Sequence, residues 1–198
     1  MLRLCDSDLM RIVISAVSTQ SRIRELVGPI AAVAQQLLGR PGVSVIYLIV
    51  EQSHATLFEE AVESRDSRLE IMTVAIGPSM LHNYLWHYRQ LPGIAARLRA
   101  DLIHFAYPVP IRRGTLFPGT ALSLQHVHAK GPHASRGVLD SLVSPWILRN
   151  HHRAMNETSR LSEPLCQQLG LGTTQVSGIP VRKEHPARQR NSRSVTAG

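Results

Sequence analysis

Apolar runs and amphipathic stretches alternate along most of this 198-residue chain. The apolar runs are rich in β-branched and aliphatic residues, which favour β-strands. The clearest of them, VSVIYLIV, is apolar on both faces, as expected of a strand that helices cover on both sides. The predicted strands, in chain order, are 11–17, 43–50, 69–76, 102–107, 120–125 and 173–180.

Apolar residues at helical spacing predict helices between these strands. The first helix follows a polar loop at 18–24 and begins near Pro29, because proline fits the first turn of a helix. Gly170 is expected to end the last helix, since glycine readily adopts the left-handed conformation found at helix C-termini. The predicted helices are 29–38, 55–63, 79–88, 91–99, 139–152 and 162–169.

This alternation predicts an α/β fold, a single Rossmann-like, doubly wound domain with a mainly parallel sheet and helices on both faces. Right-handed crossovers bring the carboxyl ends of all parallel strands to one edge. Ligands bind at that edge, near the point where the strand order reverses. The candidate binding loops are therefore those that directly follow strands, at 17–24, 51–54, 107–114 and 125–133.

The net charge of +8 is concentrated near the C-terminus. Residues 181–198 hold five basic residues and one glutamate, which is half of the net charge, and almost no large apolar side chains. Such a composition is typical of a disordered segment. We therefore expect an N-terminal extension at 1–9, a folded domain at 10–180 and a disordered basic tail at 181–198.

The location of the charge also bears on partners. Outside the tail the charge is mild, and the low aromatic content of 5% argues against a surface on which bases stack, so no specific nucleic-acid binding is expected. One alternative function stays open, a non-catalytic α/β binding module that holds an anionic partner through the basic tail and a histidine-rich edge.

No stretch of the sequence is typical of a membrane span or a secretory signal. No apolar run reaches the roughly 18 residues that cross a bilayer, and the N-terminal MLRLCDSDLM lacks an apolar core. Cys5 and Cys166 are too far apart in sequence to form a metal or redox motif. These features predict a cytoplasmic protein without a transmembrane segment, and they leave open a peripheral position at the membrane surface.

The candidate loops carry polar groups but no complete catalytic motif. The first loop holds Thr19, Gln20 and Arg22, which suit an anionic or polyhydroxyl ligand, yet the loop has neither a G-x-G-x-x-G pattern nor a P-loop lysine. A solvated turn before a helix is an equally good interpretation. Arg112 and Arg113 either hold a phosphate or lie solvated at the surface.

Histidines gather after the fifth predicted strand. His126 and His128 would share one face of an extended segment, where they could form a metal pair. No carboxylate or cysteine joins them locally, so zinc is weakly supported. A single histidine acting as acid or base at the strand end is the more economical hypothesis. His104, by contrast, is flanked by apolar residues and is expected to be a hydrogen-bonded core residue.

Three segments resemble, in order, the N-terminal half of family 4 glycosyltransferases, which are retaining enzymes with the two-domain GT-B fold. They are RIVISAVSTQ, AAVAQQLLGRPGVSVIYLIV and LWHYRQLPGIAARLRADLIHFAYPVPIRRG, and the resemblance covers residues 10–125 well and 126–180 poorly. It implies one half of a GT-B fold and a hexosyl-transfer reaction in polysaccharide or glycolipid assembly. In this family the N-terminal domain holds the acceptor and the C-terminal domain binds the nucleotide-sugar donor. No metal or other cofactor is implied.

The resemblance also implies a set of site residues at the strand-end loops. It gives the catalytic role to His126, because the family usually has a Thr-Leu-His-Asp strand end here. Without a gap, however, Gln125 aligns with that histidine, so the two positions stay open alternatives. The substrate-binding residues that the resemblance implies are Thr19, Gln20, Arg22, Tyr107, Arg112, Gln125 and His128.

Two departures from the family pattern affect the expected activity. First, the family's short glycine-containing turn before the first helix is replaced here by residues 22–26. Second, the segment SGIPV resembles the family's interdomain linker, but it leads into the basic tail. A GT-B enzyme works between its two domains, and the donor domain stabilises the departing nucleotide diphosphate. We therefore expect a truncated enzyme, or one subunit of a split enzyme, that binds a sugar or lipid-linked acceptor. Transfer would then need a partner chain with the donor domain.

Overall fold

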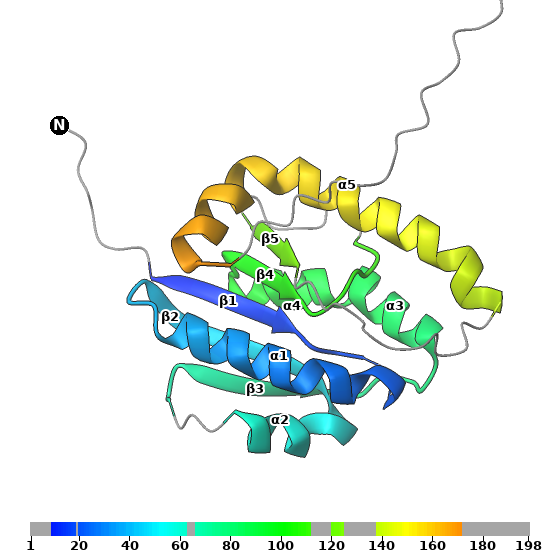
Figure 1. Ribbon diagram of the computed structural model, residues 1–198, viewed down its shortest axis with the longest axis horizontal. Coiled ribbons are helices and arrows are strands. Elements are labelled where there is room, and N and C mark those ends of the chain that lie inside the picture. The colour runs from blue at the N-terminus through cyan, green and yellow to red at the C-terminus, as the bar shows by residue number, and fades with distance from the viewer. Residues whose placement is uncertain (1–8, 19, 63–65, 112–119, 125–137, 172–198) are drawn as a thin grey trace, which may run out of the picture.

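The computed structural model describes residues 9–18, 20–62, 66–111, 120–124 and 138–171 (Figure 1). Five strands form one sheet with the order β3-β2-β1-β4-β5, and every pairing is parallel. This confirms the predicted Rossmann-like α/β fold. The strands are β1 (Met10–Ser15), β2 (Val43–Glu51), β3 (Leu69–Val74), β4 (Leu102–Phe105) and β5 (Ala121–Leu124).

Two sequence predictions fall on segments that the structure does not describe. The strand predicted at 173–180 and the tail predicted at 181–198 both lie outside the described residues, as does nearly all of the extension predicted at 1–9. They stay predictions.

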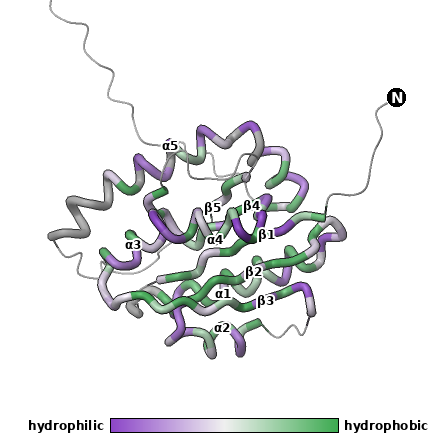
Figure 2. Tube along the Cα trace, turned by 180° about the vertical axis from the view of Figure 1, so that it is seen from behind, coloured by the Kyte–Doolittle hydropathy of each residue, from purple (hydrophilic) through white to green (hydrophobic). Residues whose placement is uncertain are grey.

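Most of the sheet is buried because its strands are apolar on both faces, as the hydropathy colours of β1 and β2 show in Figure 2. Every residue of β4 and β5 is buried, and in β1 only Arg11 is exposed. The edge strand β3 contains no fully buried residue. Continuous apolar runs of this kind are typical of parallel strands that lie between two layers of helices.

Helices cover both faces of this sheet. Figure 1 shows α1 on one face and α4 on the other, as right-handed crossovers that run in opposite directions from β1 require. None of the described helices combines the length and apolar character that a membrane crossing needs. The helices are α1 (Gln20–Leu38), the short 3₁₀ helix η1 (Gln52–His54), α2 (Ala55–Ala61), α3 (Met80–Arg89), α4 (Leu91–Leu98) and α5 (Val138–Leu169).

Helix α1 is longer than the sequence pattern predicts. The loop predicted at 18–24 and the first-turn position predicted for Pro29 are wrong, because the helix includes most of that loop and has Pro29 in its interior. The apolar stripe extends toward the N-terminus, with Ile23, Leu26 and Ile30 all buried. Pro29 is exposed on the outer side, so the stripe stays intact despite the missing backbone N–H.

Helix α5 is one continuous helix, whereas the sequence pattern predicts two, at 139–152 and 162–169. The polar stretch between them is helical because its charged and amide side chains, such as Asn156, lie on the exposed face. Thr158 donates its hydroxyl to the Ala154 carbonyl one turn earlier, at 3.2 Å. Polarity in this stretch therefore marks a solvated helix face and not a break.

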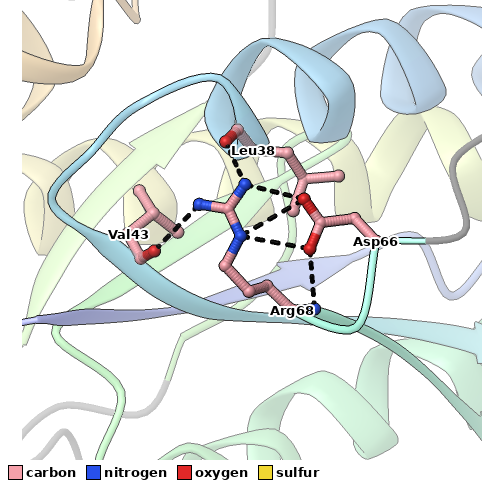
Figure 3. Close-up of polar contacts among 4 residues, drawn as sticks. All are labelled: Leu38, Val43, Asp66 and Arg68. Atoms are coloured by element: carbon pink, nitrogen blue, oxygen red, sulfur yellow. Dashed lines mark hydrogen bonds and ion pairs between the residues drawn. The ribbon is translucent and has the colours of Figure 1, made fainter.

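Arg68 connects several elements at the amino edge of the sheet, where the strands begin (Figure 3). Its guanidinium donates to the carbonyls of Leu38 at 2.6 Å and Val43 at 3.4 Å, and to the Asp66 carboxylate at 2.7 Å. The side-chain hydrogen bond from Arg68 lowers the pKa of Asp66. Since Leu38 ends α1 and Val43 begins β2, one side chain connects a helix end to the starts of two strands.

The direction of winding reverses at β1. From β1 the chain proceeds to β2 and β3 on one side, and it then returns to place β4 and β5 on the other side. β1 and β4 are therefore neighbours whose following segments lead in opposite directions. In open parallel sheets, ligands bind outside the carboxyl ends of the two strands at this switch point.

Candidate functional site

The candidate site is the carboxyl edge of β1 and β4, at the switch point of the sheet. The backbone continues the sheet beyond both strands, because the Ala106 N–H donates to the Ser15 carbonyl at 3.2 Å and the Ala16 N–H to the Ile49 carbonyl at 2.9 Å. The exits of the two strands are therefore held side by side. The segments that leave the sheet here begin at Val17 and Tyr107.

Tyr107 joins the two strand exits to helix α3. Its hydroxyl donates to the Val17 carbonyl at 2.7 Å and accepts a hydrogen bond from the Asn83 side-chain amide. The side chain is 7% exposed, so it belongs to the layer just beneath the surface. The structure thus places Tyr107 at the predicted edge, with its hydroxyl engaged in holding that edge together.

His87 extends this polar cluster below the edge. Its Nδ1 lies 2.9 Å from the Asn83 carbonyl and its Nε2 lies 2.9 Å from the Ser15 hydroxyl. A carbonyl only accepts, so Nδ1 carries the proton and Nε2 accepts from Ser15. Burial lowers the pKa of His87 to about 4, against the raising effect of the Asn83 carbonyl and with a smaller lowering effect from His151. The imidazole is therefore neutral at physiological pH.

The Ser15–His87 pair has the hydrogen bond of a nucleophile and its general base, with a third group that orients the base. Its burial excludes that function in the described conformation. Ser15 is 1% exposed and His87 is 2% exposed, so no substrate carbonyl can approach the hydroxyl. The rings of Trp86 and Tyr107 pack edge-on against His87, at centroid distances of 4.9 and 6.1 Å. The hydrogen bond between Ser15 and His87 therefore has a structural role, in which it connects β1 to α3.

Three atoms of the same cluster have no hydrogen-bond partner. They are the Ser18 hydroxyl oxygen, the side-chain carbonyl oxygen of Asn83 and the indole nitrogen of Trp86. All three residues are at least 98% buried. Ser18 directly follows Val17 on the β1 exit, and Asn83 and Trp86 lie one turn apart on α3. The described edge therefore contains hydrogen-bonding capacity that its own residues do not use.

Helix α5 holds the segment that leaves β4. The His151 Nδ1 lies 3.0 Å from the Val109 carbonyl, and the Asn150 side-chain oxygen accepts from the Ile111 N–H at 2.6 Å. The His151 ring also packs edge-on against Phe105, with centroids 5.2 Å apart. The β4 exit is thus fixed from two sides, by α3 through Tyr107 and by α5 through these contacts.

His104 confirms the core role that its apolar flanks predict. It is buried, and its Nδ1 lies 2.7 Å from the Ser123 hydroxyl on the neighbouring strand β5. Ser123 also hydrogen-bonds the buried thiol of Cys166, whose pKa is raised because burial disfavours the thiolate. A protonated thiol is a poor nucleophile, so this group connects β4, β5 and α5 without forming a reactive site.

The exit of β2 carries a second polar group beside the switch point. The Glu51 carboxylate accepts from the Ser53 N–H at 2.9 Å and from the Ser53 hydroxyl, which caps the 3₁₀ helix η1. The His54 Nδ1 lies 3.5 Å from the same carboxylate. The Glu51 carboxylate therefore caps the short helix that follows β2, and this contact marks the end of the strand.

Of the residues predicted for the site, only Tyr107 has a described side chain. The backbones of Gln20 and Arg22 form the first turn of α1, but their side chains are not among the described ones. The remaining predicted residues lie outside the described part of the chain, and their roles stay predictions. They are Thr19, Arg112, Gln125, His126 and His128.

Helix α3 supplies site residues that the sequence pattern did not indicate. Asn83, Trp86 and His87 come from a segment predicted only as a helix. One signal was available, since Asn83 and His87 are four residues apart and so share a helix face with Trp86 nearby. Within the part of the chain that the structure describes, no group of three or more histidine, cysteine or acidic side chains could hold a metal ion.

Comparison with known proteins adds no relative to this picture. No protein-family model, no curated protein and no solved structure matches the chain.

Proposed function

We propose that this domain is the acceptor-binding half of a retaining glycosyltransferase of the GT-B type, similar to the N-terminal domain of family 4. The acceptor would lie at the carboxyl edge of β1 and β4. The proposal joins the ordered resemblance of three sequence segments to the position of the switch point, which is where open parallel sheets bind ligands.

The observation that carries the proposal is the neutral polar character of this edge. The described polar side chains directly beneath the exits of β1 and β4 and on the facing part of α3 are two serines, an asparagine, a tyrosine and a histidine that burial keeps neutral, so the layer under this edge holds no charge. Neutral donors and acceptors combined with aromatic rings suit a polyhydroxyl ligand better than an anion, which needs charged or backbone donors. A sugar acceptor has this chemistry.

The proposal gives this domain the acceptor side of the reaction and no more. In a GT-B enzyme, transfer takes place between two domains, and the described residues form the sheet of one. Stabilisation of the leaving nucleotide diphosphate is then the task of a second domain. We therefore expect this chain to bind an acceptor and to transfer no sugar by itself.

Two measurements on the purified chain test this proposal. A glycan array that includes lipid-linked saccharides reports acceptor binding, and a panel of nucleotide sugars incubated with the array hits reports transfer. We expect selective binding of one saccharide class without turnover. Tyr107→Phe, which removes the hydroxyl that ties the strand exits, should weaken binding several-fold, whereas Asp66→Asn at the opposite edge should not.

Two outcomes would count against the proposal. Robust turnover by the chain alone would show that it contains donor-binding and catalytic groups of its own. Absence of saccharide binding, with intact fold, would remove the acceptor role.

A further inference from the structure

Helix α3 exposes two leucines on the face that points away from the sheet. Leu81 is 64% exposed and Leu85 is 39% exposed, and the half-buried Tyr88 follows one turn later. Positions 81, 85 and 88 have the i, i+4, i+7 spacing of one helix face. Single exposed apolar residues are common on proteins, whereas leucines that adjoin one another on one helix favour a contact surface.

The opposite face of the same helix is the one that packs on the fold. Asn83, Trp86 and His87 are buried there, and the hydrogen bonds of Asn83 and His87 connect the helix to the β4 exit and to β1. Both views of the chain show α3 at the periphery of the molecule (Figure 1, Figure 2). Packing of the domain itself therefore does not account for the two exposed leucines.

Helices α3 and α4 carry positive charge and no negative charge. Residues 71–100 contain three arginines, Arg89, Arg97 and Arg99, and no aspartate or glutamate. All three arginines are exposed, and Arg89 lies one turn after Leu85 at the border of the apolar face. An apolar stripe bordered by cations is the pattern of helices that lie in a membrane interface.

The charge also selects among the partners that could cover this face. In a symmetric dimer the same patch lies on both subunits, so a second copy of this chain would bring the positive charges against one another. A nucleic acid would match the arginines through its phosphates but would gain nothing from the exposed leucines. An anionic lipid surface matches both, with phosphates for the arginines and an acyl boundary for the leucines.

We propose that the outward face of α3 docks the domain on an anionic lipid surface. Leu81 and Leu85 insert at the boundary between headgroups and acyl chains, and Arg89 contacts the lipid phosphates. Because Asn83 on the inner face of α3 contacts Tyr107, docking holds the carboxyl edge of the sheet near the lipid surface. The inference does not rest on the acceptor function proposed above, and either can fail without the other.

Cosedimentation of the full chain with lipid vesicles tests this docking. Vesicles of phosphatidylcholine alone are compared with vesicles of phosphatidylcholine and phosphatidylglycerol in equal parts, and the bound fraction gives a partition coefficient. We expect partitioning onto the anionic vesicles and little onto the neutral ones. A net charge of +8 attracts anionic vesicles by itself, so variants identify the surface that docks.

Leu81→Ser is the matching variant and Leu57→Ser is its control. Leu57 is 40% exposed on α2, where it lies three residues before the exposed Glu60. Leu81→Ser should weaken partitioning about fivefold to thirtyfold, because it removes most of one leucine side chain from the inserted surface, whereas Leu57→Ser should leave partitioning unchanged. Arg89→Gln should weaken it about fivefold, and Arg24→Gln on α1 should have a smaller effect.

The thermal midpoints of Leu81→Ser and Leu57→Ser should stay close to that of the wild type, since both leucines are exposed. Equal partitioning of Leu81→Ser and the wild type, or no partitioning onto anionic vesicles, would overturn the proposal. Light scattering provides a further test. A dimer that Leu81→Ser converts to a monomer would also overturn it, because a second copy of the chain would then cover this face.

Discussion

Protonation of His87 should couple the stability of this domain to pH. The folded chain buries the imidazole between Ser15 and the Asn83 carbonyl, and burial lowers its pKa from 6.5 to about 4. Between these two values the unfolded chain takes up a proton that the folded chain does not. Folded-state stability therefore falls as the pH is lowered from 6.5 to about 4, and the loss levels off below that.

The size of the effect follows from the shift. One pKa unit corresponds to 1.36 kcal/mol, so a lowering of this extent amounts to about 3 kcal/mol of stability at pH 7 that is absent at pH 4. A domain of this kind is stabilised by roughly 5–15 kcal/mol in total. Lowering the pH from 7 to 4 should thus remove a substantial share of the free energy of unfolding through this one side chain.

The perturbation that isolates this effect is His87→Gln, which removes the titrating ring and keeps a polar side chain. Urea unfolding of both proteins at several pH values between 7 and 4 gives the free energy of unfolding. We expect the variant to be less stable than the wild type at pH 7, because the hydrogen bonds to Ser15 and Asn83 are lost. The difference should shrink by about 3 kcal/mol on acidification to pH 4.

The control is His82→Gln, which removes an exposed histidine from the same helix and so separates burial from the mere loss of an imidazole. The expectation would be refuted if His87→Gln lost stability on acidification as steeply as the wild type. That result would mean that His87 is protonated, or solvated, in the folded state.

Three further predictions concern other parts of the fold. Asp66→Asn should lower stability at neutral pH. Because the hydrogen bond from Arg68 lowers the pKa of Asp66 from 3.8, urea titrations should show the difference between variant and wild type beginning to shrink as the pH falls below 3.8 and continuing to shrink through the lowered pKa of the folded state. Arg99→Gly should raise the unfolding free energy by up to about 1 kcal/mol, because Arg99 has a φ of 52° at the end of α4. This left-handed conformation costs an L-residue about 1–2 kcal/mol, which the greater freedom of glycine in the unfolded chain partly offsets. Arg99→Val should lower the unfolding free energy. Leu48→Ala in the fully buried centre of β2 should cost about 2–5 kcal/mol in the same assay, and a cost under about 1 kcal/mol would contradict the packing described for the sheet.

The sheet was predictable from the sequence because burial on both faces leaves a simple pattern. A strand such as β2 must be apolar along its whole length, and no exposed helix has that pattern. Helix boundaries were harder to predict. The first turn of α1 and the middle of α5 are polar because those residues face solvent, and solvated helix faces resemble loops when the sequence is considered alone.

For the candidate site, the sequence indicated a position in the fold and few of the contacts. Topology directed attention to the carboxyl edge, where the structure describes Tyr107, and the binding role of that edge stays a prediction. The partners of Tyr107 and Ser15 come from α3, where Asn83 and His87 have the appearance of ordinary polar positions of a surface helix. The Ser15–His87 contact joins residues 72 positions apart, and the Asn83–Tyr107 contact joins residues 24 apart. Only the folded arrangement of β1, β4 and α3 brings these side chains together.

The proposed acceptor site at the carboxyl edge of β1 and β4 is tested most directly by a map of backbone-amide chemical-shift changes. The ¹⁵N-labelled chain is titrated with the best saccharide from the glycan array. We expect the largest changes at Val17, Ser18 and Tyr107 and on the facing part of α3, with none around Arg68 at the opposite edge. Changes centred on Arg68, or spread evenly over the sheet, would contradict it.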